Sequence, residues 1–314
     1  MSRKAWLQLV LPLIGLSVLF WLLAFAPSEK HHQPPLLELS VILRDGDGAV
    51  STMRKGMEQA AQDLNVELRF LIPAEDSSAV QQAQLLEREV AGAAPAVLLI
   101  PADREALGDA VSAAAGKTTL VTVETDMTAW GAAASITMDH QALGAALGAA
   151  ALNGVPEGGT VLLLDSLPGD NGIRERMEAA KAVLEREGRQ ARVYKWDPDT
   201  TSLPDILRIE RPRAIIAFEA AALADVAELS RGEDAFPLLY GCGSTSGIAA
   251  ALEKGRVTAI TAVNVFSAGY LAVEAAAALA RHEDWTAAAP VAFSIVRQET
   301  MYDSDNQKLL FPVT

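Results

Sequence analysis

The chain has 314 residues, 50% of them hydrophobic, and a formal net charge of −14 at pH 7. This length is enough for two lobes with separate cores, whereas the negative charge argues against a nucleic-acid partner, because phosphate binding depends on clustered Lys and Arg. The single cysteine, Cys242, excludes a disulfide framework and a thiolate metal cluster.

The N-terminal segment predicts a membrane anchor. Residues 5–26 follow Arg3 and Lys4, are almost entirely apolar, and are long enough to cross a hydrocarbon core of about 30 Å. The basic residues before the segment place the N-terminus in the cytoplasm. Ala24-Phe25-Ala26 resembles a signal-peptidase site, but Pro27 follows it directly, which favours a retained anchor. A cleaved signal peptide is the alternative.

The first strand-like run ends in a glycine-containing break, Arg44-Asp45-Gly46-Asp47-Gly48. Its glycines resemble the start of a dinucleotide fingerprint, but Ser51 occupies the third glycine position. Lys55-Gly56 reverses the order that a P-loop requires. The break therefore predicts a polar loop before a helix N-terminus, and no nucleotide cofactor.

Short β-rich runs then alternate with helical runs, which is typical of a parallel sheet with crossover helices. In the first half, strands are predicted at 39–44, 66–72, 96–100, 120–124 and 135–138, with helices at 50–64, 79–91, 106–115 and 141–153. After Pro156-Glu157-Gly158-Gly159 the pattern restarts, with strands at 161–164, 191–196, 214–218, 237–240 and 259–262. The pattern predicts two similar α/β halves.

Polar residues gather where the predicted strands end. They lie at 45–50, 101–103, 124–126, 165–176, 219 and 241–244. In open parallel sheets, ligands bind beyond the carboxyl ends of the strands. Two sheets that face each other with these ends would form a ligand-binding cleft.

Several stretches of the sequence, considered together and in their order along the chain, are similar to those of a known protein family. They are RKGMEQAAQDLNVEL (54–68), AVLLIPAD (96–103), NGIRERMEAAKAVL (171–184), YGCGSTSGIAAALEKGRVTAITAVNVFSAGYLAVEAA (240–276) and ETMYDSDNQKLLFP (299–312). From about residue 37 to 312 the chain resembles the type I periplasmic binding proteins of the ribose-binding class, the solute receptors of sugar importers. In this comparison the last stretch is similar to the final crossover and terminal strand.

The resemblance implies an α/β fold of two similar doubly wound parallel-sheet lobes joined by a three-segment hinge. The apolar segment at 5–26 adds one N-terminal transmembrane helix before this fold. The implied division is a signal anchor and linker at 1–36, an N-terminal lobe at 37–140 plus 264–295, and a C-terminal lobe at 141–263 plus 296–314. The chain is expected to cross between lobes near 139–141, 263–265 and 294–297.

The resemblance also implies ligand-binding positions, carried over one residue at a time. In the first lobe they are Asp47, Ala49, Val50, Asp103, Glu124 and Asp126. In the second lobe and hinge they are Arg176, Glu219, Gly243 and Asn264. Ala49 and Val50 stand where the family has ring-stacking aromatic residues, and Gly243 stands where it has a turn aspartate. These departures predict weak or no binding of ribose, galactose and glucose.

The chemistry of Arg176 agrees with a binding role, since a guanidinium at a helix start offers a planar fork of donors to hydroxyls or a carboxylate. Arg174 is a near alternative. A surface salt bridge with Glu175 or Glu178 would also account for Arg176.

The acidic candidates have structural alternatives as well. Asp103 and Asp126 could accept hydrogen bonds from a ligand, or each could cap the helix that follows it. Glu219 precedes an apolar run, so a carboxylate at this buried strand end needs a partner.

Catalysis has little support. Gly243-Ser244-Thr245-Ser246-Gly247 imitates a nucleophile elbow, but its centre is Thr and no His occupies a triad position. Asp45-Gly46-Asp47 lacks the further carboxylates of a calcium loop. We therefore expect no enzyme, cofactor or metal site. We expect instead a membrane-anchored extracytoplasmic protein that binds a small polar, sugar-like solute and delivers it to an ABC permease. The alternative is a ligand sensor for a membrane histidine kinase.

Overall fold

The structure, a computed structural model, describes residues 35–44, 49–74, 78–167, 170–197, 203–232, 235–286 and 289–311. The chain divides into two units, Met1–Pro35 and Leu36–Thr314. The expected anchor and Asp47 lie outside the described residues, so the anchor stays a prediction. Among the residues that are described, none of the helices combines the length and the apolar character needed to span a bilayer.

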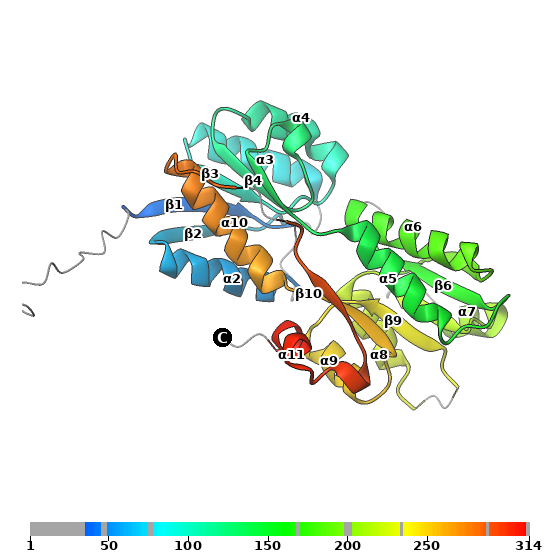
Figure 1. The fold of residues 1–314 in the computed structure, drawn as a ribbon. Helices are drawn as coiled ribbons and strands as arrows, with labels where there is room; N and C mark the ends of the chain where they lie inside the picture. Colours follow the sequence, from blue (N-terminus) through cyan, green and yellow to red (C-terminus); the bar gives the residue numbers. More distant parts are fainter. Residues whose placement is uncertain are drawn as a thin grey trace, which may run out of the picture. The chain divides into compact units, whose positions relative to one another are not determined.

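The first sheet is fully parallel, in the order β2-β1-β3-β4-β5 (Figure 1). Its strands are β1 Leu37–Ile42, β2 Val66–Leu71, β3 Ala96–Leu99, β4 Thr119–Glu124 and β5 Ala134–Thr137. Its helices are α2 Ala49–Asp63, α3 Ala79–Ala91, α4 Arg104–Ala114 and, from much later in the chain, α10 Val265–Ala280; a short 3-10 helix, η1, spans Thr128–Trp130. One core cluster joins α2 and α10 to the sheet, and a separate cluster joins α3 and α4 to it.

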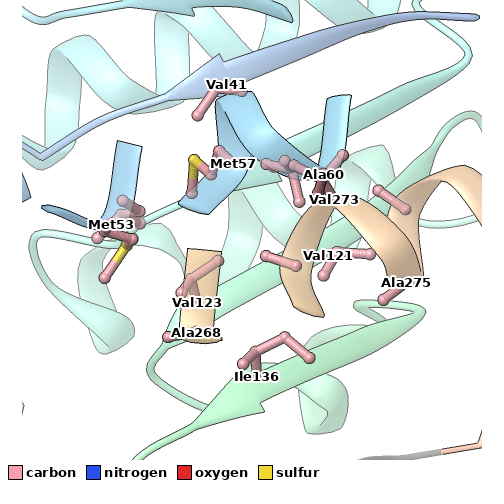
Figure 2. Packing of buried hydrophobic residues seen from close by; sticks show 14 of the residues in the cluster. Val41, Met53, Met57, Ala60, Val121, Val123, Ile136, Ala268, Val273 and Ala275 are labelled. Carbon is pink, nitrogen blue, oxygen red and sulfur yellow. The ribbon is translucent and has the colours of Figure 1, made fainter. Parts of the chain in front are cut away.

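Small residues let α10 pack closely on α2. Figure 2 shows Met53 and Met57 of α2 near Ala268 and Val273 of α10, in the cluster that also contains β1, β4 and β5 residues. A Cβ added at Gly269 would overlap the backbone oxygen of Met53. The close contact therefore requires glycine at this position of α10.

The second sheet has the order β11-β10-β9-β8-β6-β7, and it is parallel except for β11, which runs antiparallel to β10. Its strands are β6 Thr160–Asp165, β7 Gln190–Lys195, β8 Ala214–Ala217, β9 Leu238–Cys242, β10 Ala259–Val263 and β11 Phe293–Val296. Its helices are α5 His140–Leu152, α6 Asn171–Arg186, α7 Leu203–Glu210, α8 Ala220–Leu229, α9 Ser246–Glu253 and α11 Ser304–Leu310, with a 3-10 helix, η2, at Gln298–Thr300. One core cluster includes α5 and α6 residues, and another includes α7, α8, α9 and α11 residues.

The predicted alternation of strands and helices is confirmed, with each predicted element displaced by two residues or fewer at either end. The two-lobe, doubly wound architecture is therefore confirmed. The closing stretch differs from the expectation of a crossover and terminal strand: within its described part it forms η2 and α11. The helix α11 has seven residues, Ser304–Leu310, and its last residue, Leu310, is buried in the core cluster that includes α7, α8 and α9 residues.

The backbone crosses between the sheets three times. The first two crossings join β5 to α5 and β10 to α10, as expected. At the third, Val291 N–H donates to Thr137 O at 2.8 Å and Ala292 O accepts from Asn264 N–H at 3.4 Å, so this crossing lies beside the other two. It therefore precedes β11, and the expected position at 294–297 was too late. The lobe boundary expected between 295 and 296 falls inside β11.

Candidate ligand-binding cleft

A cavity of about 520 Å³ lies beyond the carboxyl ends of strands from both sheets. Its lining residues come from both lobes: Arg44, Thr52, Glu124, Met138, Leu143, Leu167, Asp170, Ile173, Arg176, Glu219, Ala220, Ala221, Ala224, Cys242, Gly243, Ser244, Thr245, Thr261, Val263 and Val265. The volume falls in the range of small-molecule sites. No aromatic side chain occurs among these described lining residues, which are polar or aliphatic.

Arg176 is fixed at this cavity by two neutral acceptors. It lies on α6, whose first turn is capped by Asp170 through a 2.8 Å bond from Ile173 N–H to Oδ1. Its Nε donates to His140 Nδ1 at 3.1 Å, and its Nη1 donates to Phe218 O at 2.8 Å. The guanidinium is therefore held in one orientation without a carboxylate partner in either bond.

Arg174, the near alternative, is placed differently. Its side chain is exposed, donates to Asn171 Oδ1 at 2.7 Å, and is not among the cavity-lining residues. The structure therefore favours Arg176 over Arg174 at the cavity. Direct contact between Arg176 and a ligand stays a prediction.

Arg44 is a cavity residue that the sequence analysis did not select. Its Nη1 lies 2.7 Å from Asp170 Oδ2 in the second lobe and 3.4 Å from Glu124 Oε2 in the first. These side chains are only 14%, 11% and 19% exposed, respectively. An arginine at the end of an apolar strand was the available signal, since a charge there needs partners. The partners come from distant parts of the chain, so the sequence did not identify them.

Glu124 occupies an uncommon backbone conformation. Its φ is 70°, in the left-handed region that costs a non-glycine residue free energy. Its side chain lines the cavity and its backbone oxygen lies 3.2 Å from His140 Nε2. A strained residue at a cavity, restrained from both sides, is typical of a functional site.

Neither Asp103 nor Asp126 lines the cavity, and only Asp103 is the capping residue of the helix that follows it. Asp103 caps α4 by accepting from Ala106 N–H at 2.8 Å. Asp126 accepts from the N–H and the hydroxyl of Thr128 at 2.8 and 2.7 Å. Burial raises the pKa of Asp126, but the hydrogen bonds from Thr128, together with Ser135 and the charge of Arg104, outweigh that effect and hold the pKa below its usual value.

Glu219 lies at the cavity and also caps a helix. It lines the cavity, and its two carboxylate oxygens accept from Ala221 N–H at 2.6 Å and Ala222 N–H at 3.0 Å, which caps α8. The helix N-terminus supplies the partner that its burial requires.

Gly243 lines the cavity with a φ of 129°. A Cβ there would lie 2.8 Å from Ala220 Cβ, so the turn has no room for the aspartate found in the resembled family. Asn264 is not a lining residue; its side chain caps α10 by accepting from Ser267 N–H at 3.0 Å. Ala49 and Val50 begin α2, but their side chains lie outside the described part.

The part of the chain that the structure describes contains no group of three or more His, Cys, Asp or Glu side chains placed to hold a metal ion. The buried Cys242 Sγ instead accepts a hydrogen bond from Thr261 Oγ1 at 3.1 Å.

The fold is similar to that of known solute-binding proteins. A carbohydrate transporter solute-binding protein from Agrobacterium radiobacter, in complex with D-arabinose, has a TM-score of 0.81 and 18% identity, over 88% of this chain and 99% of that one. An ABC transporter solute-binding protein from Agrobacterium vitis with bound D-fucose has a TM-score of 0.80 and 17% identity, over 87% and 100%. A XylFII–LytSN complex has a TM-score of 0.76 and 14% identity, over 85% and 99%.

No protein of curated function matches the sequence. Residues 40–284, most of the chain, match the periplasmic binding protein domain family. The chain therefore belongs to the periplasmic binding protein domain family.

Proposed function

We propose that this protein is an extracytoplasmic, non-enzymatic solute-binding protein that captures a small polar, sugar-like ligand between its lobes and delivers it to an ABC importer. The observation that carries the proposal is the cavity between two parallel-sheet lobes, with Arg176 held there by His140 and Phe218 O. A ligand that contacts both lobes favours the arrangement in which they lie close together.

The similar structures with D-arabinose and D-fucose support the sugar-like ligand class. At 17 to 18% identity they share the fold, and the ligand of this chain is our own inference. The cavity lacks aromatic lining within its described residues, so affinity would come mainly from hydrogen bonds. An aromatic contact is worth about 0.5–1.5 kcal/mol beyond area burial. We therefore expect ribose, galactose and glucose to bind weakly or not at all.

A second role, ligand sensing with a membrane histidine kinase, is favoured by one observation. One of the similar structures is a complex of two different proteins, XylFII and LytSN. Crosslinking in native membranes separates the two roles, because ligand-dependent crosslinks to a permease support import and crosslinks to a kinase support sensing.

We further propose that the apolar segment 5–26 is retained and anchors the binding domain at the outer face of the membrane. N-terminal sequencing of the protein from membranes of its native host tests this. Retention of the first residues is expected, and a soluble form that begins near Pro27 would overturn the proposal.

Calorimetry tests the binding function directly. Pentoses, hexoses, deoxysugars and sugar acids would be titrated into the wild-type chain and into Arg176→Ala and Arg174→Ala variants. We expect one class to bind, and Arg176→Ala to lose about tenfold or more in affinity, equivalent to about 1.4 kcal/mol. The exposed Arg174 serves as the matched control and should matter little. Equal affinity in wild type and Arg176→Ala would show that Arg176 does not contribute to ligand binding. Tight ribose binding would contradict the expected selectivity.

A further inference from the structure

His140 lies behind the cavity wall at the first crossing between the lobes. It is the first residue of α5 and only 7% exposed, and it is not itself a lining residue. One ring nitrogen, Nδ1, accepts from Arg176 Nε at 3.1 Å. The other, Nε2, lies 3.2 Å from the backbone oxygen of Glu124. The imidazole thus joins a cavity residue of each lobe.

These two contacts determine the tautomer of the ring. An arginine Nε–H can only donate, so Nδ1 must carry its lone pair. The proton therefore lies on Nε2 and is donated to Glu124 O. A cationic ring would direct an N–H at the Arg176 guanidinium and break the arrangement.

The charges around the ring support the neutral form. Burial and the positive charge of Arg176 lower the pKa of His140 to about 4, and Arg44 adds a smaller effect in the same direction. The Glu124 carbonyl and the charge of Asp170 oppose the shift but do not outweigh it. The ring is accordingly neutral at pH 7.

Close packing holds the ring and its partner in place. A Cβ at Gly172 would lie 2.9 Å from His140 Cε1 and Nε2, so the first turn of α6 packs directly on the imidazole. One turn further along α5, a Cβ at Gly144 would overlap the backbone oxygen of Arg176. Asp139 caps α5 by accepting from Ala142 N–H at 2.8 Å. The ring and the backbone of Arg176 are therefore restrained together.

We propose that His140 is the positioning residue of the cleft: through its neutral Nε2–H tautomer it sets the Arg176 guanidinium for ligand binding and ties it to the Glu124 carbonyl of the opposite lobe. This proposal rests on the proposed function, because it assigns Arg176 to the ligand. It goes beyond that function by naming a residue that touches no ligand and still determines affinity.

Two substitutions of His140 test its two hydrogen bonds, to Arg176 and to Glu124 O, one at a time. His140→Asn places an amide oxygen near the Nδ1 position, which preserves an acceptor for Arg176 but loses the reach to Glu124. His140→Gln extends to the Nε2 position, which preserves a donor to Glu124 but removes the acceptor for Arg176. The exposed His282, at φ 59°, tolerates His282→Asn and supplies the control.

Nitrogen NMR of the full-length chain in mild detergent, with labelled histidine and arginine, gives the first readout. We expect His140 as a neutral Nε2–H ring at pH 7, and Arg176 Nε–H exchange about tenfold or more faster in His140→Gln than in His140→Asn. A cationic ring, an Nδ1–H tautomer or equal exchange in the two variants would overturn the proposal. Thermal unfolding of each variant verifies that it is folded, and these readouts need no ligand.

Calorimetry with D-arabinose gives the second readout. We expect His140→Gln to weaken binding about tenfold or more, with a smaller loss in His140→Asn and none in His282→Asn. Equal losses in the Gln and Asn variants would contradict positioning through Arg176. A wild-type chain that binds no D-arabinose would count against D-arabinose as the sugar-like ligand of the proposed function, while the NMR result would still decide the role of His140.

Discussion

The two lobes use the same packing device beside the cleft. In the first lobe, α10 packs on α2 because Gly269 leaves no side chain against the Met53 backbone; in the second, α5 packs on α6 because Gly144 leaves none against the Arg176 backbone. Both α5 and α10 follow a crossing between the lobes, and each is capped by the residue before it, Asp139 or Asn264.

The two contacts restrain different side chains. Met53 is buried in the first core, as Figure 2 shows, whereas Arg176 lies at the cavity. The first contact therefore restrains a residue with a core side chain, whereas the second restrains a residue with a charged side chain at the cavity. The comparison teaches that a glycine contact between helices has no functional meaning by itself. Its meaning depends on the side chain carried by the restrained residue.

The largest expected difference between the two helix pairs is in pH dependence, because α5 begins with His140 and α10 begins with Val265. The folded state lowers the pKa of His140 from 6.5 to about 4, so the unfolded chain binds more protons between these values. Stability from this residue is complete above pH 6.5 and decreases as the pH falls to about 4. The loss is about 3 kcal/mol, from 1.36 kcal/mol per pKa unit.

Urea unfolding at pH 7 and pH 4 measures this effect. Because carboxylates also titrate in this range, the wild-type chain is compared with His140→Asn. The wild type should lose about 3 kcal/mol more than the variant. Parallel losses in both proteins would mean that His140 is not held neutral in the folded state.

The glycines themselves should show a somewhat smaller effect. Gly144→Ala and Gly269→Ala each place a methyl group where a backbone oxygen lies, and overpacking of this kind costs about 1–3 kcal/mol. Gly247, in α9, is the control: a Cβ there would meet only Thr245 Oγ1 at 4.0 Å, so Gly247→Ala should stabilise by up to about 1 kcal/mol. Chemical denaturation measures all three. If Gly144→Ala or Gly269→Ala raised the free energy of unfolding as Gly247→Ala does, the helices would not pack as closely at that glycine as the structure shows.

A double-mutant cycle on Arg44 and Asp170 extends the comparison to the contact between the lobes. This pair is 2.7 Å apart and poorly exposed, so we expect a coupling free energy of about 1–2 kcal/mol. Arg54 and Glu58, 2.8 Å apart and 46% exposed on α2, form the control pair, with an expected coupling below about 0.5 kcal/mol. Equal couplings would show that Arg44 does not hold the lobes together in solution.

The smallest effect concerns Asp103, which caps α4 outside the cavity. Asp103→Ala should cost about 1 kcal/mol of stability, whereas Asp103→Asn should retain most of the cap. Neither change should alter the affinity for a bound sugar in calorimetry. A loss of affinity in both variants would show that Asp103 contributes to ligand binding.

The fold was largely predictable because each lobe repeats a local pattern of buried strand and amphipathic helix. The cleft was only partly predictable. Arg176 and Glu219 were proposed from the resemblance to the family, and a charge at a helix start or a buried strand end agreed with that choice. Arg44 and His140 were missed because their partners, Asp170 and the Glu124 carbonyl, are distant in sequence and only the folded chain brings them together.

Gly243 limits how the selectivity of this cleft could be changed. Its φ of 129° is one that L side chains rarely adopt, and Ala220 Cβ would lie 2.8 Å from any added Cβ. A carboxylate therefore cannot be grafted onto this turn by a single substitution without cost. An aspartate at this turn would require a first change at Ala220, to glycine, and a reshaped turn. The path from this cleft to the turn of the ribose-binding class that the sequence resembles therefore passes through at least two coupled steps.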